Sequence, residues 1–127
     1  MKTVYVESSV ISYLTARPSR DVVTAARQAI TLEWWEEHGI QYGICLSELV
    51  LEEIGPKDSS AAQRRLGLVE NAPILETTES AVELSKLLIT EKAIPETSTE
   101  DALPIGIAAV QGMDFLLTVM LQRYHPR

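Results

Sequence analysis

VYVESSV, residues 4–10, is the stretch of sequence from which the fold can be inferred. Its first three residues are β-prone and predict a short buried strand. Glu7 follows at the end of that strand, and Ser8 or Ser9 is the expected cap of a helix with apolar positions 10, 11 and 14. Open parallel sheets bind ligands beyond the carboxyl ends of their strands, so Glu7 occupies a candidate site position. The competing interpretation is that Glu7 is solvated or only assists the helix start.

The same order of strand, hydroxyl or acidic cap, and helix continues along the chain. Further strands are expected at residues 42–46, 73–76 and 114–119. Helices are expected from Asp21 to about His38, from a cap at Ser47 to about Ile54, from Asp58 or Ser59 to Val69, from Thr78 to about Lys92, and from about Asp101 to Gly112. This alternation predicts an α/β protein, with three α/β/α layers and a parallel sheet.

Two of the helices have apolar residues at positions that predict a buried face. On the helix after Asp21 these are Val23, Ala26, Ile30 and Trp34, and on the helix after Thr78 they are Ala81, Val82, Leu84, Leu87 and Leu88. The length of 127 residues suits a single domain over 1–127, in which residues 119–127 carry no pattern and are expected to form an irregular tail.

Charge and composition restrict the classes of function that are possible. A net charge of −7 opposes binding to nucleic acid, unless a local basic patch or a bridging cation compensates it. Arg17, Arg20 and the Arg64-Arg65 pair are candidate phosphate contacts. The single cysteine, Cys45, cannot form an internal disulfide, which favours the reducing cytoplasm, and a buried position is expected for it. No apolar run is long enough to span a membrane.

Acidic residues recur where the predicted strands lead into helices: Glu7, a set formed by Glu48, Glu52 and Glu53, and Asp101. Helical spacing places Glu48 and Glu52 on one face and Glu53 elsewhere, so the residues alone leave the choice within this set open. Carboxylates gathered at one sheet edge repel one another unless a hard cation, Mg²⁺ or Mn²⁺, holds them together. Such an ion activates water and bridges a phosphodiester, and it also supplies the positive charge that the protein lacks.

Four segments together resemble a PIN domain, and within that family the VapC-like nucleases of bacterial toxin–antitoxin pairs. They are VYVESSVIS at 4–12, SELVLEEI at 47–54, DALPIGIAA at 101–109 and LLT at 116–118, and the likeness covers about residues 1–118. The resemblance implies an Mg²⁺- or Mn²⁺-dependent endoribonuclease, the toxin of a type II pair. It implies Glu7, Glu53 and Asp101 as catalytic metal ligands, with Ser9 and Thr118 in support. The implied partners are RNA and a cognate antitoxin, and a homodimer is expected.

The sequence departs from the family pattern in four places. Glu7 stands where most members have Asp, Pro104 stands where a polar residue is expected, and Met120 replaces an acid or amide. The family pattern also continues with a closing strand and helix, whereas this chain ends at Arg127, so we expect a C-terminally shortened copy. These departures support an alternative function, a catalytically impaired PIN-like module that dimerises or binds a partner. A third interpretation is an unrelated α/β protein whose acids only cap helices.

Overall fold

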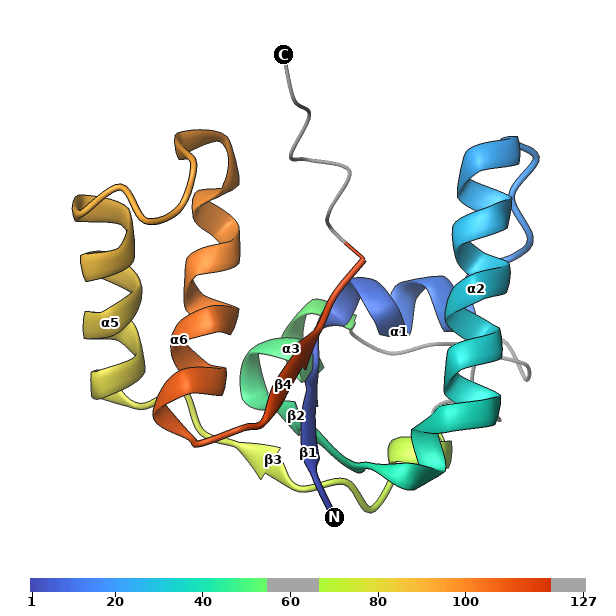
Figure 1. Cartoon of the computed structure of the whole chain (residues 1–127), viewed down its shortest axis with the longest axis horizontal. Helices are drawn as coiled ribbons and strands as arrows, with labels where there is room; N and C mark the ends of the chain where they lie inside the picture. Colours follow the sequence, from blue (N-terminus) through green and yellow to red (C-terminus); the bar gives the residue numbers. More distant parts are fainter. Residues whose placement is uncertain (55–66, 120–127) are drawn as a thin grey trace.

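The structure is a computed structural model that describes residues 1–54 and 67–119 (Figure 1). Its elements, in which η denotes a 3-10 helix, are β1 (Thr3–Val6), α1 (Ser8–Thr15), α2 (Val22–His38), η1 (Gly39–Gln41), β2 (Gly43–Ser47), α3 (Glu48–Ile54), η2 (Gly67–Val69), β3 (Ile74–Leu75), α5 (Glu79–Thr90), η3 (Glu96–Asp101), α6 (Ala102–Val110) and β4 (Phe115–Leu117). Within the part of the chain that is described, no helix is both long enough and apolar enough to span a bilayer.

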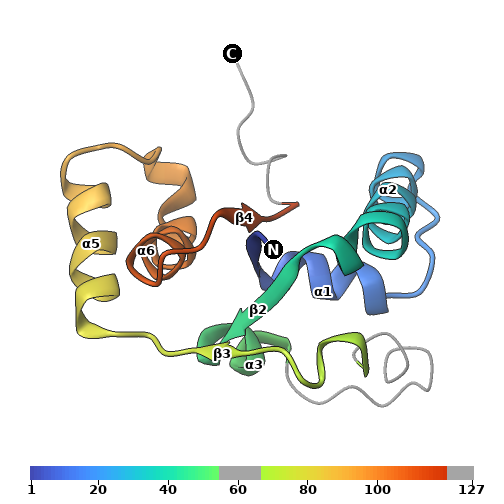
Figure 2. The same cartoon turned by 60° about the horizontal axis from the view of Figure 1, so that its bottom comes forward.

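The sheet has four parallel strands in the order β3-β2-β1-β4. Helices α1 and α2 lie on one side of it, and α5 and α6 lie on the other (Figure 2). Right-handed crossovers require this division, because the chain leaves β1 toward β2 and later returns past β1 to β4. The predicted α/β class and parallel sheet are therefore confirmed. The carboxyl ends of β1 and β4 form the switch point at which open α/β sheets bind ligands.

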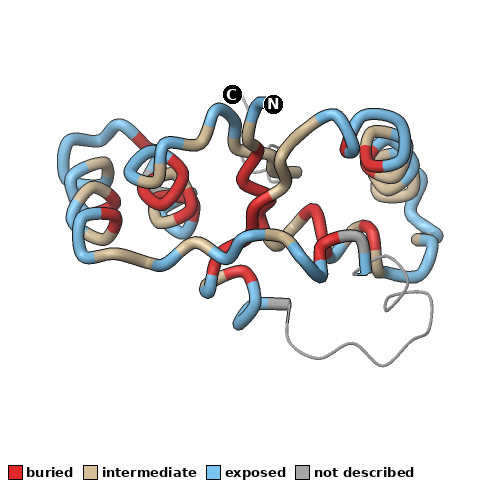
Figure 3. The backbone as a smooth tube through the Cα atoms, turned by 90° about the horizontal axis from the view of Figure 1, so that it is seen from below, coloured by how far each residue is buried: buried red, intermediate tan, exposed pale blue. Residues whose placement is uncertain are grey.

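The central strands hold the core, and Figure 3 shows the buried backbone concentrated along them. The largest fully buried side chains come from β1, α1, β2, α3 and α6, and include Tyr5, Ile11, Leu14, Leu46, Val50 and Ile107. Cys45 is also buried, as expected from its apolar surroundings. Burial of apolar surface from elements far apart in sequence stabilises the sheet and holds the carboxyl ends of its strands in place.

Most helix boundaries agree with those expected from the caps. Asp21, Ser47 and Thr78 each accept a hydrogen bond from a backbone N–H in the first turn of the following helix. The predicted C-cap at Gly112 is shifted by one residue, because Gln111 is the C-cap and Gly112 follows it with φ of +71°. The helix predicted up to Val69 lies outside the described residues except for η2, as do Arg64, Arg65 and residues 120–127 of the predicted tail.

The buried face predicted for α2 is wrong. Val23 and Ile30 are 56% and 66% exposed, and the helix instead buries Thr31 and Trp35. Trp34 is half-buried and stacks on Tyr42, with ring centroids 5.7 Å apart. Apolar residues lie on more than one side of this helix, so periodicity alone did not identify the side that packs against the protein.

The buried face predicted for α5 is only partly correct. Ala81 is buried, and Val82, Leu84 and Leu88 are partly buried, but Leu87 is 54% exposed. Ser85 takes a buried position instead, and its hydroxyl donates to the carbonyl oxygen of Val82 at 2.7 Å. The side of α5 that packs against the protein is therefore lined by smaller residues than expected, which suits close contact with α6.

The contact between α5 and α6 depends on Gly106. A Cβ added to Gly106 would lie 2.6 Å from the carbonyl oxygen of Ala81, which is backbone and cannot move aside cheaply. Gly106→Ala is expected to lower the free energy of unfolding by about 2 kcal/mol, although alanine is normally the better helix former. Thermal denaturation measures the loss. Gly39→Ala is the control, since its Cβ would meet only tryptophan ring atoms at 4.0 Å; equal effects of both changes would contradict the close packing.

Candidate functional site

Glu7 lies at the switch point and is 4% exposed. Its backbone N–H donates to the carbonyl oxygen of Leu117 at 3.1 Å, which fixes it between β1 and β4. Its carboxylate is the N-cap of α1 and accepts from the backbone N–H of Ser9 at 2.9 Å. The prediction that Ser8 or Ser9 caps this helix is therefore wrong, because the longer arm of Glu7 reaches the first turn and both serine hydroxyls donate to it.

Four donors surround the Glu7 carboxylate. Ser9 Oγ and Thr118 Oγ1 donate to Oε1 at 2.6 and 3.0 Å, and Ser9 N–H and Ser8 Oγ each donate to Oε2 at 2.9 Å. A carboxylate has about four acceptor positions, so protein groups fill them all. This explains how the protein tolerates a buried acid. Ser9 and Thr118, the two residues predicted to support Glu7, both contact it.

Ser8 joins Glu7 to Glu53. Its hydroxyl lies 2.9 Å from Glu7 Oε2 and 3.1 Å from Glu53 Oε1, so these two carboxylate oxygens are at most about 6 Å apart. One hydroxyl proton cannot serve both acceptors fully at once. The side chain of Glu53 is exposed, as are those of Glu48 and Glu52. Glu53 is thus the member of the α3 set whose carboxylate meets Glu7 through a shared donor.

A buried hydrogen-bond chain fixes the orientation of α3. Tyr5 Oη and Ser47 Oγ are 2.7 Å apart and both residues are fully buried, and Ser47 Oγ also accepts from Val50 N–H at 3.2 Å. Burial raises the pKa of the Tyr5 hydroxyl, and the negative charges of Glu53 and Glu7 raise it further. We did not predict the role of Tyr5 from the sequence, although a tyrosine within an otherwise aliphatic buried strand signals a polar partner.

Ser47→Ala is expected to destabilise the protein by about 2–3 kcal/mol, because it removes the α3 cap and leaves the buried Tyr5 hydroxyl without this partner. Tyr5→Phe removes only one of the two bonds to Ser47 and should cost about 1 kcal/mol. Urea denaturation of both variants tests the order of these losses. A larger loss in Tyr5→Phe would show that Ser47 does not link β1 to α3 as described.

Asp101 is 9% exposed and occupies the last position of η3, immediately before α6. It stands at the N-cap of α6 with αR backbone angles, and its side chain makes no capping hydrogen bond there. Among residues 1–54 and 67–119, no three His, Cys, Asp or Glu side chains gather closely enough to hold a metal ion. The arrangement therefore pairs Glu7 with Glu53, while the predicted grouping of both with Asp101 is not seen in the described residues.

The donors to the carboxylate pair are neutral. In the described part of the chain, Glu7 and Glu53 accept only from hydroxyl and backbone N–H groups, and the chain as a whole carries a net charge of −7. Two carboxylates this close repel unless a proton or a cation compensates one of them. Carboxylate oxygens are the ligands that Mg²⁺ takes in proteins, usually one or two per ion beside water and phosphate. The two carboxylates therefore supply the kind of oxygen ligand that such an ion takes, and an ion that binds Glu7 displaces one of its hydrogen-bond donors.

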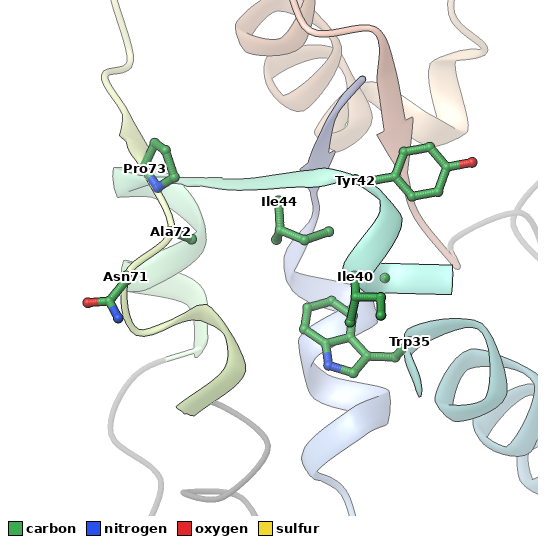
Figure 4. A pocket seen from close by; sticks show the side chains of 8 residues that line it. Trp35, Ile40, Tyr42, Ile44, Asn71, Ala72 and Pro73 are labelled. Carbon is green, nitrogen blue, oxygen red and sulfur yellow. The ribbon is translucent and has the colours of Figure 1, made fainter. Parts of the chain in front are cut away.

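A pocket of about 330 Å³ lies elsewhere, toward the amino-terminal end of β2 (Figure 4). Its lining residues are mainly apolar, namely Trp35, Gly39, Ile40, Tyr42, Ile44, Asn71, Ala72 and Pro73. None of them takes part in the carboxylate pair. The candidate chemistry therefore lies at the carboxyl end of the sheet and not in this pocket.

No family model matches the chain, and no curated protein matches it. The structure itself defines an α/β protein with a parallel sheet, in which the Ser8 hydroxyl bridges the carboxylates of Glu7 and Glu53 at the switch point.

Proposed function

We propose that this chain is a PIN-like, VapC-like endoribonuclease that depends on Mg²⁺ or Mn²⁺, the toxin component of a type II toxin–antitoxin pair. The observation that carries the proposal is the Ser8 hydroxyl shared by Glu7 and Glu53. It joins the carboxylate of Glu7, which directly follows β1, to that of Glu53 on α3, at the edge of the sheet where open α/β proteins bind ligands. We further propose that it acts in the cytoplasm, where its partners are RNA and a cognate antitoxin.

Glu7 and Glu53 are the residues that would hold the ion, with Asp101 as the third ligand implied by the PIN-domain motifs. When bound, Mg²⁺ or Mn²⁺ supplies Lewis-acid activation of water and neutralises charge on a phosphodiester. Ser9 and Thr118 keep the Glu7 carboxylate in one orientation. The Ser8 hydroxyl has one proton and donates it to one carboxylate at a time, which leaves an oxygen lone pair on the other carboxylate for the ion. The exposed Arg17 and Arg20 are proposed phosphate contacts.

A matched pair of variants on α3 tests this function. Incubation of the purified chain with labelled RNA and Mn²⁺ should give cleavage products that are absent when EDTA is added. Glu53→Gln should lose this cleavage, whereas Glu52→Gln should retain it, since Glu52 is equally anionic and also exposed on α3. Cleavage that survives in Glu53→Gln would refute the assignment of Glu53.

The second candidate function is a catalytically impaired PIN-like module that binds a partner. The filled acceptor positions of Glu7 favour it, because a cation must displace a donor to reach this carboxylate. Pro104 also favours this candidate, because it stands where the PIN-domain pattern has a polar residue. It is buried in the first turn of α6, three residues after Asp101. This candidate predicts no cleavage at any Mn²⁺ concentration while the chain stays folded. Cleavage that Glu7→Gln abolishes would rule it out.

A further inference from the structure

Three hydrogen bonds between Thr3 and Asp114 join β1 to β4 at the amino-terminal end of these strands. Oδ2 of Asp114 accepts from Thr3 N–H at 2.8 Å and from Thr3 Oγ1 at 3.2 Å. Thr3 Oγ1 in turn accepts from Asp114 N–H at 3.1 Å. The Thr3 N–H and hydroxyl donors also hold the pKa of the Asp114 carboxyl below its usual range, so this carboxylate is charged at neutral pH. We call the three bonds the Asp114–Thr3 clamp.

The clamp lies where it can fix the register of β4 against β1. The two strands run side by side from the same end of the sheet, and the residue paired with Val4 is Phe115 (Figure 1). Thr3 and Asp114 therefore occupy the position just before the first pair of the ladder. This ladder has three residue pairs, and a slip by one residue would turn every side chain of β4 to the opposite face. The clamp adds bonds that only the observed register allows.

The opposite end of β4 meets Glu7. Leu117 O accepts from Glu7 N–H at 3.1 Å, and Thr118 Oγ1 donates to Glu7 Oε1 at 3.0 Å. Val119 N–H donates to Ser9 Oγ at 3.2 Å, and this hydroxyl itself donates to Glu7 Oε1 at 2.6 Å. Detachment or slippage of β4 would disturb all of these contacts together. The position of the carboxylate therefore depends on a strand whose other end is about 13 Å away, at about 3.3 Å per residue.

We propose that Asp114 and Thr3 are positioning residues for Glu7, which act by holding β4 in the register that places Thr118 against the carboxylate. Both residues lie at the far end of their strands from Glu7, so they act on it only through β4. What the clamp does for a bound cation rests on the proposed function. What it does for the position of Glu7 does not, because the hydrogen bonds of β4 to Glu7 are present without an ion.

Hydrogen exchange measured by NMR on the full chain without metal tests this role. Asp114→Ala should speed exchange of the Glu7 N–H, whose acceptor follows in β4, by about tenfold, because it removes bonds to a charged carboxylate. The reference is the Leu46 N–H, which bonds to Pro73 O on the other side of the sheet. The ratio of the two exchange rates reports detachment of β4 and cancels a change in global stability.

Asp21→Ala is the matched control. The Asp21 carboxylate likewise accepts from a backbone N–H and a hydroxyl through one oxygen, both donors belonging to Thr24, but it caps α2. This variant loses the same kind of bonds and should leave the ratio of the Glu7 and Leu46 exchange rates unchanged. An equal ratio in Asp114→Ala and Asp21→Ala would overturn the proposal.

Two milder variants grade the effect. Only Oδ2 of Asp114 accepts from Thr3, so the amide oxygen in Asp114→Asn can take its place and should restore most of the protection of the Glu7 N–H. Thr3→Val keeps the Thr3 N–H bond and removes the two bonds of the hydroxyl, so its effect should lie between those of Asp114→Asn and Asp114→Ala. Asparagine that behaves like alanine would show that the bonds to Oδ2 do not hold β4.

Calorimetric titration with Mn²⁺ tests the consequence for the proposed site. Asp114→Ala should raise the dissociation constant at least about tenfold, as is typical when a residue that orients a metal ligand is lost. Asp114→Asn and Asp21→Ala should stay close to wild type. Wild-type affinity in an Asp114→Ala chain with fast Glu7 exchange would overturn the role of the clamp at the site. Failure of the wild-type chain to bind Mn²⁺ would instead refute the proposed function, and the exchange rates would still decide whether the clamp positions Glu7.

Discussion

Replacement of Glu7 by glutamine is expected to reduce Mn²⁺-dependent RNA cleavage by at least about 100-fold, because loss of a ligand should exceed the 10–100-fold effects seen when only its supporting residues change. The carboxylate is one of the two anionic groups that Ser8 brings together, and an amide of the same shape lacks the charge that a divalent cation requires. The measurement is the initial cleavage rate of a labelled RNA at saturating Mn²⁺, compared between the two proteins.

The same change should leave the fold in place, which separates loss of activity from loss of structure. The amide oxygen of the substituted side chain can take the position of Oε2 and accept from Ser9 N–H, and its NH₂ group can face the hydroxyls of Ser9 and Thr118, which rotate to accept. Loss of charge-assisted hydrogen bonds is expected to cost about 1–2 kcal/mol. A folded Glu7→Gln protein that cleaves RNA at the wild-type rate would exclude Glu7 from the site.

The second large effect is expected in the absence of substrate. Mg²⁺ or Mn²⁺ at about 100 times its dissociation constant should stabilise the folded chain by about 2.7 kcal/mol, because the ion binds the native state and not the unfolded chain. For a domain of this size the melting temperature should rise by roughly 10 °C. EDTA should reverse the rise, and an equal ionic strength of NaCl should not reproduce it. Calorimetric titration of the ion gives the dissociation constant.

The rise in melting temperature, measured in two variants, tests where the ion binds. Asp101→Asn should remove most of the gain, if Asp101 completes the site as the PIN-domain motifs imply. Glu53→Gln should raise the melting temperature slightly without cation, since it relieves repulsion between two uncompensated carboxylates, and should then show little further gain. A full gain in both variants would place the bound ion elsewhere on this acidic protein.

Local chemistry made most of the fold predictable. Caps at Asp21, Ser47 and Thr78 and the β-prone run before Glu7 depend on neighbours in sequence, so element type and order could be inferred without the tertiary structure. The parallel sheet followed from the alternation of strands and helices. The same local information placed Glu7 at the end of β1, because a carboxylate beside a helix start is recognisable in the sequence, whereas Asp101 follows η3 and not a strand.

The rotation of each helix about its own axis could not be predicted from these local signals. Helical spacing groups residues by face but does not say which face meets the sheet, so the pattern assigned Ile30 to the core although the folded protein exposes it. For the same reason it could not choose Glu53 over Glu48 or Glu52. That choice depends on the buried bond between Tyr5 and Ser47, which joins residues 42 positions apart and fixes α3 beside Ser8.

By itself the sequence determined which segments become strands and helices and that Glu7 stands between the first strand and the first helix, since capping, periodicity and β-propensity act over a few residues. Only the tertiary structure decided that Glu7 caps its own helix, that Ser8 joins it to Glu53, and that one apolar face of α2 remains exposed. These features depend on how close-packed elements from distant parts of the chain settle against one another, and no local pattern encodes that geometry.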